Sequence, residues 1–145
     1  MKDLNWSSLS FGYMKTDYNV RCYYRNGKWG EIEICSDEYI NMHMAATCLH
    51  YGQEAFEGLK AYRCPDGKVR VFRMDENAKR LQSTCRGILM PELPTELFEE
   101  MVRKVVTLNQ EWIPTYESGA TLYIRPLFIF LTAFFVLTSF VFIVN

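Results

Sequence analysis

The sharpest chemical pair in the sequence is Tyr123 and Arg125, which lie within the segment LYIRPL at residues 122–127. Leu122 and Ile124 alternate with them, a pattern typical of a strand, so Tyr123 and Arg125 share a face with Cβ atoms roughly 6–7 Å apart. The planar guanidinium of an arginine donates two hydrogen bonds to one carboxylate. The pair predicts either a site for a small anionic ligand or a solvated arginine on an outer sheet face.

Four other residues are weaker candidates when each is taken alone. Arg80 lies near the start of a predicted helix, where it could help to hold a phosphate or could simply face water. Phe56, Gly58 and Lys60 share a predicted strand face. Phe56 by itself is typical of a core residue, whereas Gly58 indicates that something approaches the backbone closely.

Period-two patterns predict the strands that must position these residues. They occur at residues 20–34, 55–64, 69–74 and 120–127. The first is interrupted by Asn26-Gly27, which tolerates the positive φ angles of a tight turn and predicts a hairpin. The second and third are joined by the turn PDGK and are predicted to pair as antiparallel strands.

Two amphipathic helices are predicted between the last two strands. Residues 75–88 place Ala78, Leu81 and Cys85 on one face, with Asp75 as the N-cap. Residues 94–112 carry a second apolar stripe. The predicted fold class is α+β, an antiparallel sheet with two packed helices.

Composition and spacing exclude several classes of function. Sixteen basic and 17 acidic residues give a net charge of −1, with no block of like charge, which argues against a nucleic-acid partner. Five cysteines without a C-x-x-C pair, and no secretory signal, predict reduced thiols in a cytoplasmic protein. His43 and His50 lack the spacing of a metal pair, so no metal site is expected. The common nucleotide-binding and hydrolase motifs are absent.

Two longer motifs carry a family resemblance. They are LHYGQEAFEGLKAYRCPDGKVRVFRMDENAKRLQSTCRGILMP at residues 49–91 and LYIRPL at residues 122–127. Together they closely resemble the amino-terminal domain of branched-chain amino acid aminotransferases, pyridoxal phosphate enzymes of fold type IV, from about Phe11 to Ile129. The resemblance implies transfer of the amino group of leucine, isoleucine or valine to 2-oxoglutarate, as in branched-chain amino acid biosynthesis.

The resemblance also implies roles for individual residues. Arg80 matches the arginine that binds the cofactor phosphate. Tyr51 matches a substrate-site tyrosine that reaches into the neighbouring subunit, which implies a homodimer. The other matches line the pocket for the amino acid and 2-oxo acid substrates: Phe11, Phe56, Gly58, Tyr123 and Arg125.

The Schiff-base lysine of the family has no counterpart in this sequence. In the family it belongs to a second, larger domain, and all seven lysines here lie in first-domain contexts. Since the cofactor supplies an electron sink but not the base, we expect no catalysis from this chain alone.

An apolar run ends the sequence. From Leu127 to Val144, 15 of 18 residues are apolar and none is charged. As a helix this run would span about 27 Å at ~1.5 Å per residue, close to the ~30 Å of a bilayer core.

We therefore divide the chain into an irregular lead-in (1–19), an aminotransferase small domain (20–129) and an aberrant apolar tail (130–145). A frame shift or truncation explains the tail most simply. A membrane segment and a soluble buried segment are the alternatives.

Two other functions stay open from the residues. One is a noncatalytic, membrane-tethered module that uses the same sheet for binding. The other is a different fold type IV enzyme, such as a D-amino acid aminotransferase or an aminodeoxychorismate lyase.

Overall fold

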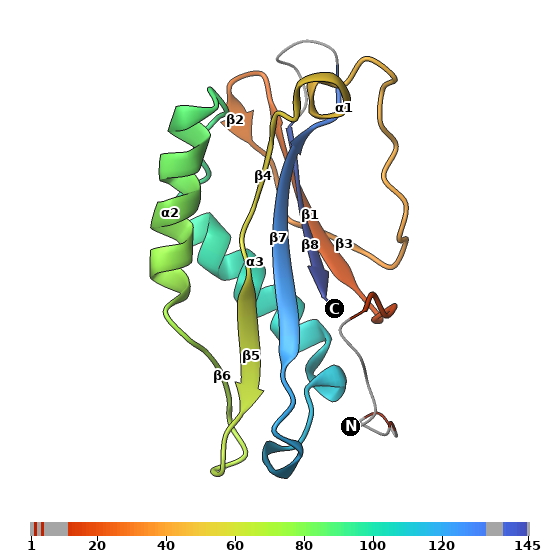
Figure 1. The fold of residues 1–145 in the computed structure, drawn as a ribbon, viewed down its shortest axis with the longest axis vertical. Helices are drawn as coiled ribbons and strands as arrows, with labels where there is room; N and C mark the ends of the chain where they lie inside the picture. Colours follow the sequence, from red (N-terminus) through yellow and green to blue (C-terminus); the bar gives the residue numbers. More distant parts are fainter. Residues whose placement is uncertain (1, 3, 5–11, 133–137, 145) are drawn as a thin grey trace.

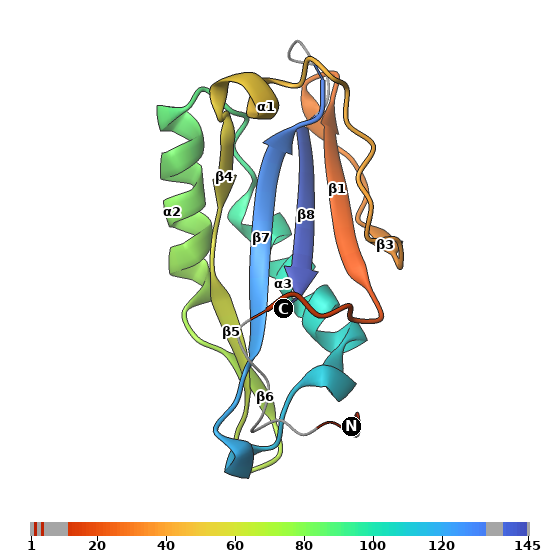
Figure 2. The same ribbon diagram turned by 45° about the vertical axis from the view of Figure 1, so that its right-hand side comes forward.

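The computed structural model describes residues 2, 4, 12–132 and 138–144, the last of these through their backbone alone. In this part of the chain, eight strands form one antiparallel sheet, and two long helices cover one of its faces (Figures 1 and 2). The predicted α+β class, with an antiparallel sheet and two packed helices, is confirmed.

The strands run in the order β2-β1-β8-β7-β5-β6, with β3 paired to β1 and β4 paired to β7. They are β1 (Asn19–Arg25), β2 (Lys28–Trp29), β3 (Glu33–Cys35), β4 (Glu54–Phe56), β5 (Leu59–Arg63), β6 (Val69–Val71), β7 (Leu122–Phe130) and β8 (Thr138–Val144). Asn26 and Gly27 have φ angles of 51° and 81° and join β1 to β2, which confirms the predicted hairpin.

The predicted strand at residues 55–64 is two strands, β4 and β5, separated at Glu57 and Gly58. Both pair with β7 and keep one register, so Glu57 and Gly58 lie opposite Pro126 and Arg125. The Glu57 N–H donates to the Pro126 carbonyl at 3.0 Å. Proline has no N–H to donate in return, which explains why the ladder breaks at this point.

Helix α2 (Met74–Gly87) buries Ala78, Leu81 and Cys85, as its pattern predicts. The prediction that Asp75 is the N-cap is wrong. Arg73 occupies the cap position in a left-handed conformation, with φ 46°, and Asp75 lies in the first turn. There its carboxylate still complements the positive end of the helix dipole.

Helix α3 (Thr95–Leu108) ends earlier than predicted, and a single 3-10 turn, η2 (Gln110–Trp112), follows it. The reason is Asn109, which is fully buried and donates from its side chain to the carbonyls of Val105 and Tyr18, each at 2.9 Å. This side chain ties the helix end to the start of β1.

The remaining helical elements are short. They are α1 (Thr47–Tyr51) and the 3-10 turn η3 (Tyr116–Ser118). Helix α1 lies beside the end of β7, where the Cys48 thiol donates to the Phe130 carbonyl at 3.2 Å.

The core lies between the sheet and the two long helices. Fully buried side chains of the helices, such as Leu81 and Phe98, pack with Ile124 and Phe128 of β7 in one cluster. Both α2 and α3 lie on this side, so these two helices leave the other face of the sheet uncovered (Figure 1).

The apolar run does not form the helix considered above. Strand β7 continues to Phe130, and β8 inserts between β1 and β7, pairing with both (Figure 2). The described ranges contain no helix that is long and apolar enough to cross a membrane. Rows of aromatic and β-branched residues suit a strand, and here the ladders of two neighbours are available to pair.

Candidate functional site

The uncovered face of the sheet brings together Phe56, Gly58, Tyr123 and Arg125. The guanidinium carbon of Arg125 lies 5.6 Å from the centre of the Phe56 ring and 5.4 Å from the centre of the Tyr123 ring. Phe56 is 65% exposed, although it is a large apolar residue. The prediction that Tyr123 and Arg125 share a strand face is correct. Phe56 is an exposed surface residue rather than a core residue.

Gly58 leaves the space that the Tyr123 side chain occupies in this cluster. It lies opposite Arg125 in the β7 register, and a Cβ atom added to it would be 2.7 Å from the Tyr123 hydroxyl. The close approach expected at Gly58 is therefore made by a tyrosine of the same chain. Any larger side chain would push the Tyr123 ring away from the strand.

Arg125 has the features of an anion receptor. It is half-buried, and its Nε–H is buried with no hydrogen-bond partner among the described residues. The two rings attract the positive charge through their faces but accept no strong hydrogen bond. Because that Nε–H is closed to solvent, a carboxylate would meet the half-buried guanidinium at its other N–H groups.

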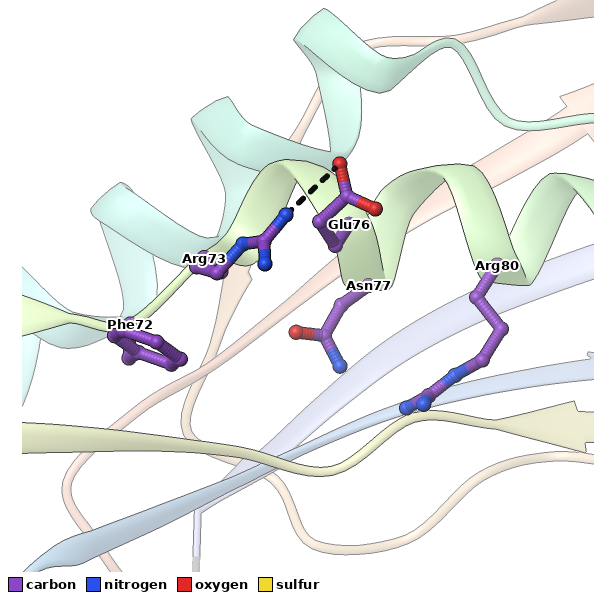
Figure 3. Close-up of a pocket in the computed structure, with 5 residues that line it drawn as sticks. All are labelled: Phe72, Arg73, Glu76, Asn77 and Arg80. Carbon is purple, nitrogen blue, oxygen red and sulfur yellow. Dashed lines mark ion pairs between the residues drawn. The ribbon is translucent and has the colours of Figure 1, made fainter.

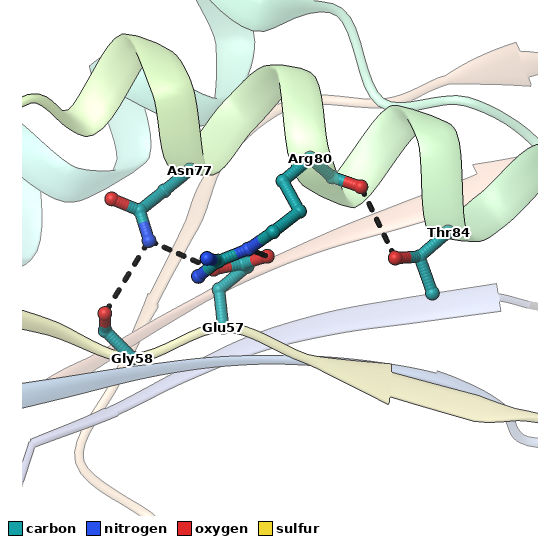
Figure 4. Close-up of polar contacts among 5 residues, drawn as sticks. All are labelled: Glu57, Gly58, Asn77, Arg80 and Thr84. Carbon is teal, nitrogen blue, oxygen red and sulfur yellow. Dashed lines mark hydrogen bonds and ion pairs between the residues drawn. The ribbon is translucent and has the colours of Figure 1, made fainter.

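Arg80 makes a different kind of contact, on the helix-covered side of the same strands (Figure 4). Its Nε donates to Glu57 Oε1 at 2.8 Å, and its Nη2 donates to Glu57 Oε2. Asn77 Nδ2 donates to Glu57 Oε2 at 2.8 Å. The hydrogen bonds and negative charge of Glu57 raise the pKa of Arg80 further above its ordinary value.

The two partners of this pair differ greatly in exposure. The Glu57 side chain is 4% exposed, whereas the Arg80 side chain is 68% exposed. Glu57 thus lies beneath Arg80, and much of the arginine stays open to solvent.

A small pocket lies next to this pair, at the start of α2 (Figure 3). Its volume is about 260 Å³, and its wall includes Arg80 and Asn77 but not Glu57. Arg73, also in the wall, pairs with Glu76 at 3.6 Å.

Of the predicted site residues that the structure describes, Tyr51 is not part of either cluster. Tyr51 ends α1 and is 83% exposed, with its ring 6.3 Å from the His50 ring. Phe11 lies outside the described residues. Tyr51 therefore projects into solvent at the end of α1.

Sequence reasoning missed Glu57. A signal was present, because Glu57 falls on the same strand face as Ala55, Leu59 and Ala61, all of which are buried. A carboxylate in such a row must find a partner, since burying an unpaired charge is costly.

The part of the chain that the structure describes contains no candidate metal site and no disulfide. No group of three or more His, Cys, Asp or Glu residues is placed there to hold a metal ion. All five cysteines are free.

Known proteins resemble this chain in sequence and in fold. No protein-family model matches the chain. A branched-chain-amino-acid aminotransferase of Haemophilus influenzae is 50% identical over 129 residues, which cover 89% of this chain. A solved Escherichia coli branched-chain amino acid aminotransferase has TM-score 0.66 and 26% identity over 90% of this chain. The chain is therefore similar in sequence and in fold to branched-chain aminotransferases.

The match to branched-chain aminotransferases concerns their amino-terminal part only. The chain spans 38% of the length of the Haemophilus relative and 41% of the Escherichia coli chain. A Thermobaculum terrenum branched-chain aminotransferase solved in its pyridoxal phosphate form shares the fold, with TM-score 0.62 and 19% identity over 90% of this chain and 40% of that chain.

The residues of this chain fit part of a pyridoxal phosphate site. Arg80 is exposed enough to receive a phosphate, and Arg125 offers a half-buried guanidinium to a carboxylate.

Proposed function

We propose that this chain forms the substrate wall and supplies the phosphate-binding arginine of a pyridoxal phosphate-dependent branched-chain aminotransferase. The observation that carries the proposal is the half-buried Arg125, whose guanidinium lies beside the rings of Phe56 and Tyr123. A cation beside an exposed apolar ring suits a ligand that has a carboxylate and an aliphatic tail.

Each residue then has a distinct task. Arg125 binds the substrate carboxylate, and Phe56 contacts the aliphatic side chain of leucine, isoleucine or valine. Tyr123, seated on Gly58, orders the wall between them. Arg80 binds the phosphate of the cofactor from the other side of the Glu57–Gly58 junction.

Pyridoxal phosphate supplies the electron sink for amino transfer to 2-oxoglutarate when it is bound. This chain contributes binding and orientation, and we infer that it is inactive alone because no lysine matches the family's base. Tyr51, exposed at the end of α1, suits a contact with a neighbouring subunit in a homodimer. Five free thiols agree with a cytoplasmic location.

The direct test is an NMR titration that measures how tightly the 145-residue chain binds the 2-oxo acid of leucine. We expect saturable binding that weakens at least about tenfold in Arg125→Gln, which corresponds to about 1.4 kcal/mol. Arg103→Gln is the matched control, because Arg103 is exposed on α3 and pairs with Glu99. Equal affinities for wild type and Arg125→Gln would refute the site.

A second measurement addresses the inferred lack of catalysis. The chain is incubated with pyridoxal phosphate, leucine and 2-oxoglutarate, and glutamate is assayed. We expect no glutamate. Turnover by this chain, with the cofactor trapped on a single lysine by borohydride, would show that the inference is wrong.

A further inference from the structure

We propose that Glu57 is a positioning residue that holds the guanidinium of Arg80 ready to accept a phosphate. The proposal rests on the phosphate-binding role of Arg80 proposed above. It concerns a residue that contacts neither cofactor nor substrate and acts through its neighbour.

The donors of Arg80 are divided between the protein and the solvent. A guanidinium has five N–H donors in a fixed planar fork. Nε and Nη2 donate to the two oxygens of Glu57, which fixes the plane and one edge of the fork. The remaining donors are available for an anion, since 68% of the side chain is exposed.

Glu57 can fix Arg80 because Glu57 itself cannot move freely. Its side chain is 4% exposed, and its backbone N–H donates to Pro126 at the break between β4 and β5. Asn77, one helical turn before Arg80, donates to the same carboxylate and lies within 3.4 Å of the Gly58 carbonyl. Helix α2 and the strand junction together hold the carboxylate in one place (Figure 4).

Two effects of Glu57 on anion binding have opposite signs. Its negative charge repels a phosphate that approaches Arg80. Its hydrogen bonds restrict the rotamers of a long side chain before the ligand arrives, which removes an entropic cost of binding. The geometry favours the second effect, because the bidentate contact orients the fork and leaves its outer edge free.

The decisive variant is Glu57→Gln, which removes the charge but keeps the size of the side chain. Its amide NH₂ faces guanidinium donors, so the fork loses a partner. We expect the affinity of the 145-residue chain for inorganic phosphate, measured by calorimetry, to fall about tenfold, or about 1.4 kcal/mol. Unchanged or tighter binding would mean that charge repulsion dominates and would refute the proposal.

A matched control exists in the turn between β5 and β6. Asp66 accepts two hydrogen bonds from Arg70, at 2.8 and 2.7 Å, also as a bidentate pair but from the two Nη atoms and on the surface. Asp66→Asn changes the net charge by the same amount as Glu57→Gln. We expect its phosphate affinity to equal that of wild type, and a loss as large as in Glu57→Gln would contradict the proposal.

If Glu57 acts by orienting Arg80, and not only through its negative charge, two further measurements should show it. Glu57→Asp keeps the charge but withdraws the carboxylate by one methylene, and we expect it to weaken phosphate binding as well. In NMR spectra, the Arg80 Nε–H of wild type should exchange slowly with water, and this protection should be lost in both Glu57 variants. Retained protection in both variants would overturn the proposal.

Two further outcomes are distinguishable. If wild type binds no phosphate, the role of Arg80 in the proposed function fails, and the Nε–H protection alone decides whether Glu57 orients it. If Glu57→Gln does not fold, Asn77→Ala replaces it, because it removes one hydrogen bond from the carboxylate. We then expect about two- to threefold weaker binding, the lower end for one hydrogen bond, and unchanged binding would count against the proposal.

Discussion

The two faces of the β4–β5–β7 region use the same strands for different purposes. On the helix-covered face, Leu59, Ala61 and Ile124 are at most 4% exposed and belong to the core. On the opposite face, Phe56 is 65% exposed and lies next to the half-buried Arg125. One face is packed in the core, whereas the other exposes an aromatic ring beside a cationic group.

Glu57 is the exception on the helix-covered face. It lies in the buried row, yet it is charged, and it faces a helix that supplies an arginine for it. A buried carboxylate with a well-aligned partner is weak evidence for stability, because desolvation offsets much of the attraction. Its position between Phe56 and Gly58 instead suits a functional role.

The largest difference between the faces should be seen in stability. Phe98→Ala removes a fully buried ring from the helix side and should lower the free energy of unfolding by about 3–5 kcal/mol. Phe56→Ala, on the uncovered face, should change it by about 0.5 kcal/mol or less. Urea denaturation of both variants gives the comparison, and similar losses would show that the two faces pack alike.

A buried thiol on the helix-covered face should make the free energy of unfolding depend on pH. Burial raises the pKa of the Cys85 thiol from 9.0 to about 12. A raised folded-state pKa means that the thiol's contribution is complete below about pH 9. It is then lost as the pH rises from 9 towards 12, by at most about 1.4 kcal/mol per pH unit.

Cys85→Ala isolates this contribution. Urea titrations of both proteins between pH 8 and pH 11 should show a smaller alkaline loss of stability in the variant. Parallel curves would mean that the thiolate forms as easily in the folded chain as in the unfolded one.

The smallest expected changes in stability are those of two glycine substitutions, which should have opposite signs. Gly58→Ala should destabilise the fold by roughly 1 kcal/mol, at the low end of overpacking, because the end of the Tyr123 side chain can move away from the new Cβ. Gly87→Ala, at the end of α2 with open space around it, should stabilise the chain by up to about 1 kcal/mol. Thermal unfolding measures both changes, and equal shifts would contradict the contact between Gly58 and Tyr123.

Much of the fold could be predicted from local pattern. The turn at Asn26-Gly27, the buried stripe of α2 and the shared face of Tyr123 and Arg125 follow from backbone geometry and side-chain periodicity. The N-cap of α2 could not be predicted this way, because Arg73 adopts a left-handed conformation that its residue type does not favour.

The tail shows the limit of composition. An uncharged apolar run satisfies the requirements of a membrane helix and of a central strand equally well, because both are surrounded by apolar groups. What decides between them is whether neighbouring strands offer unpaired backbone groups. Strands β1 and β7 do so, and β8 pairs with both.

The sequence by itself determined the alternation of buried and exposed residues, and with it which side chains could meet on one strand. It also carried the motifs shared with branched-chain aminotransferases. Only the tertiary structure decided that Arg80 meets Glu57 and that Gly58 lies under Tyr123. Periodicity fixes the direction of a side chain along its own element, whereas a contact between elements depends on how helices and strands pack.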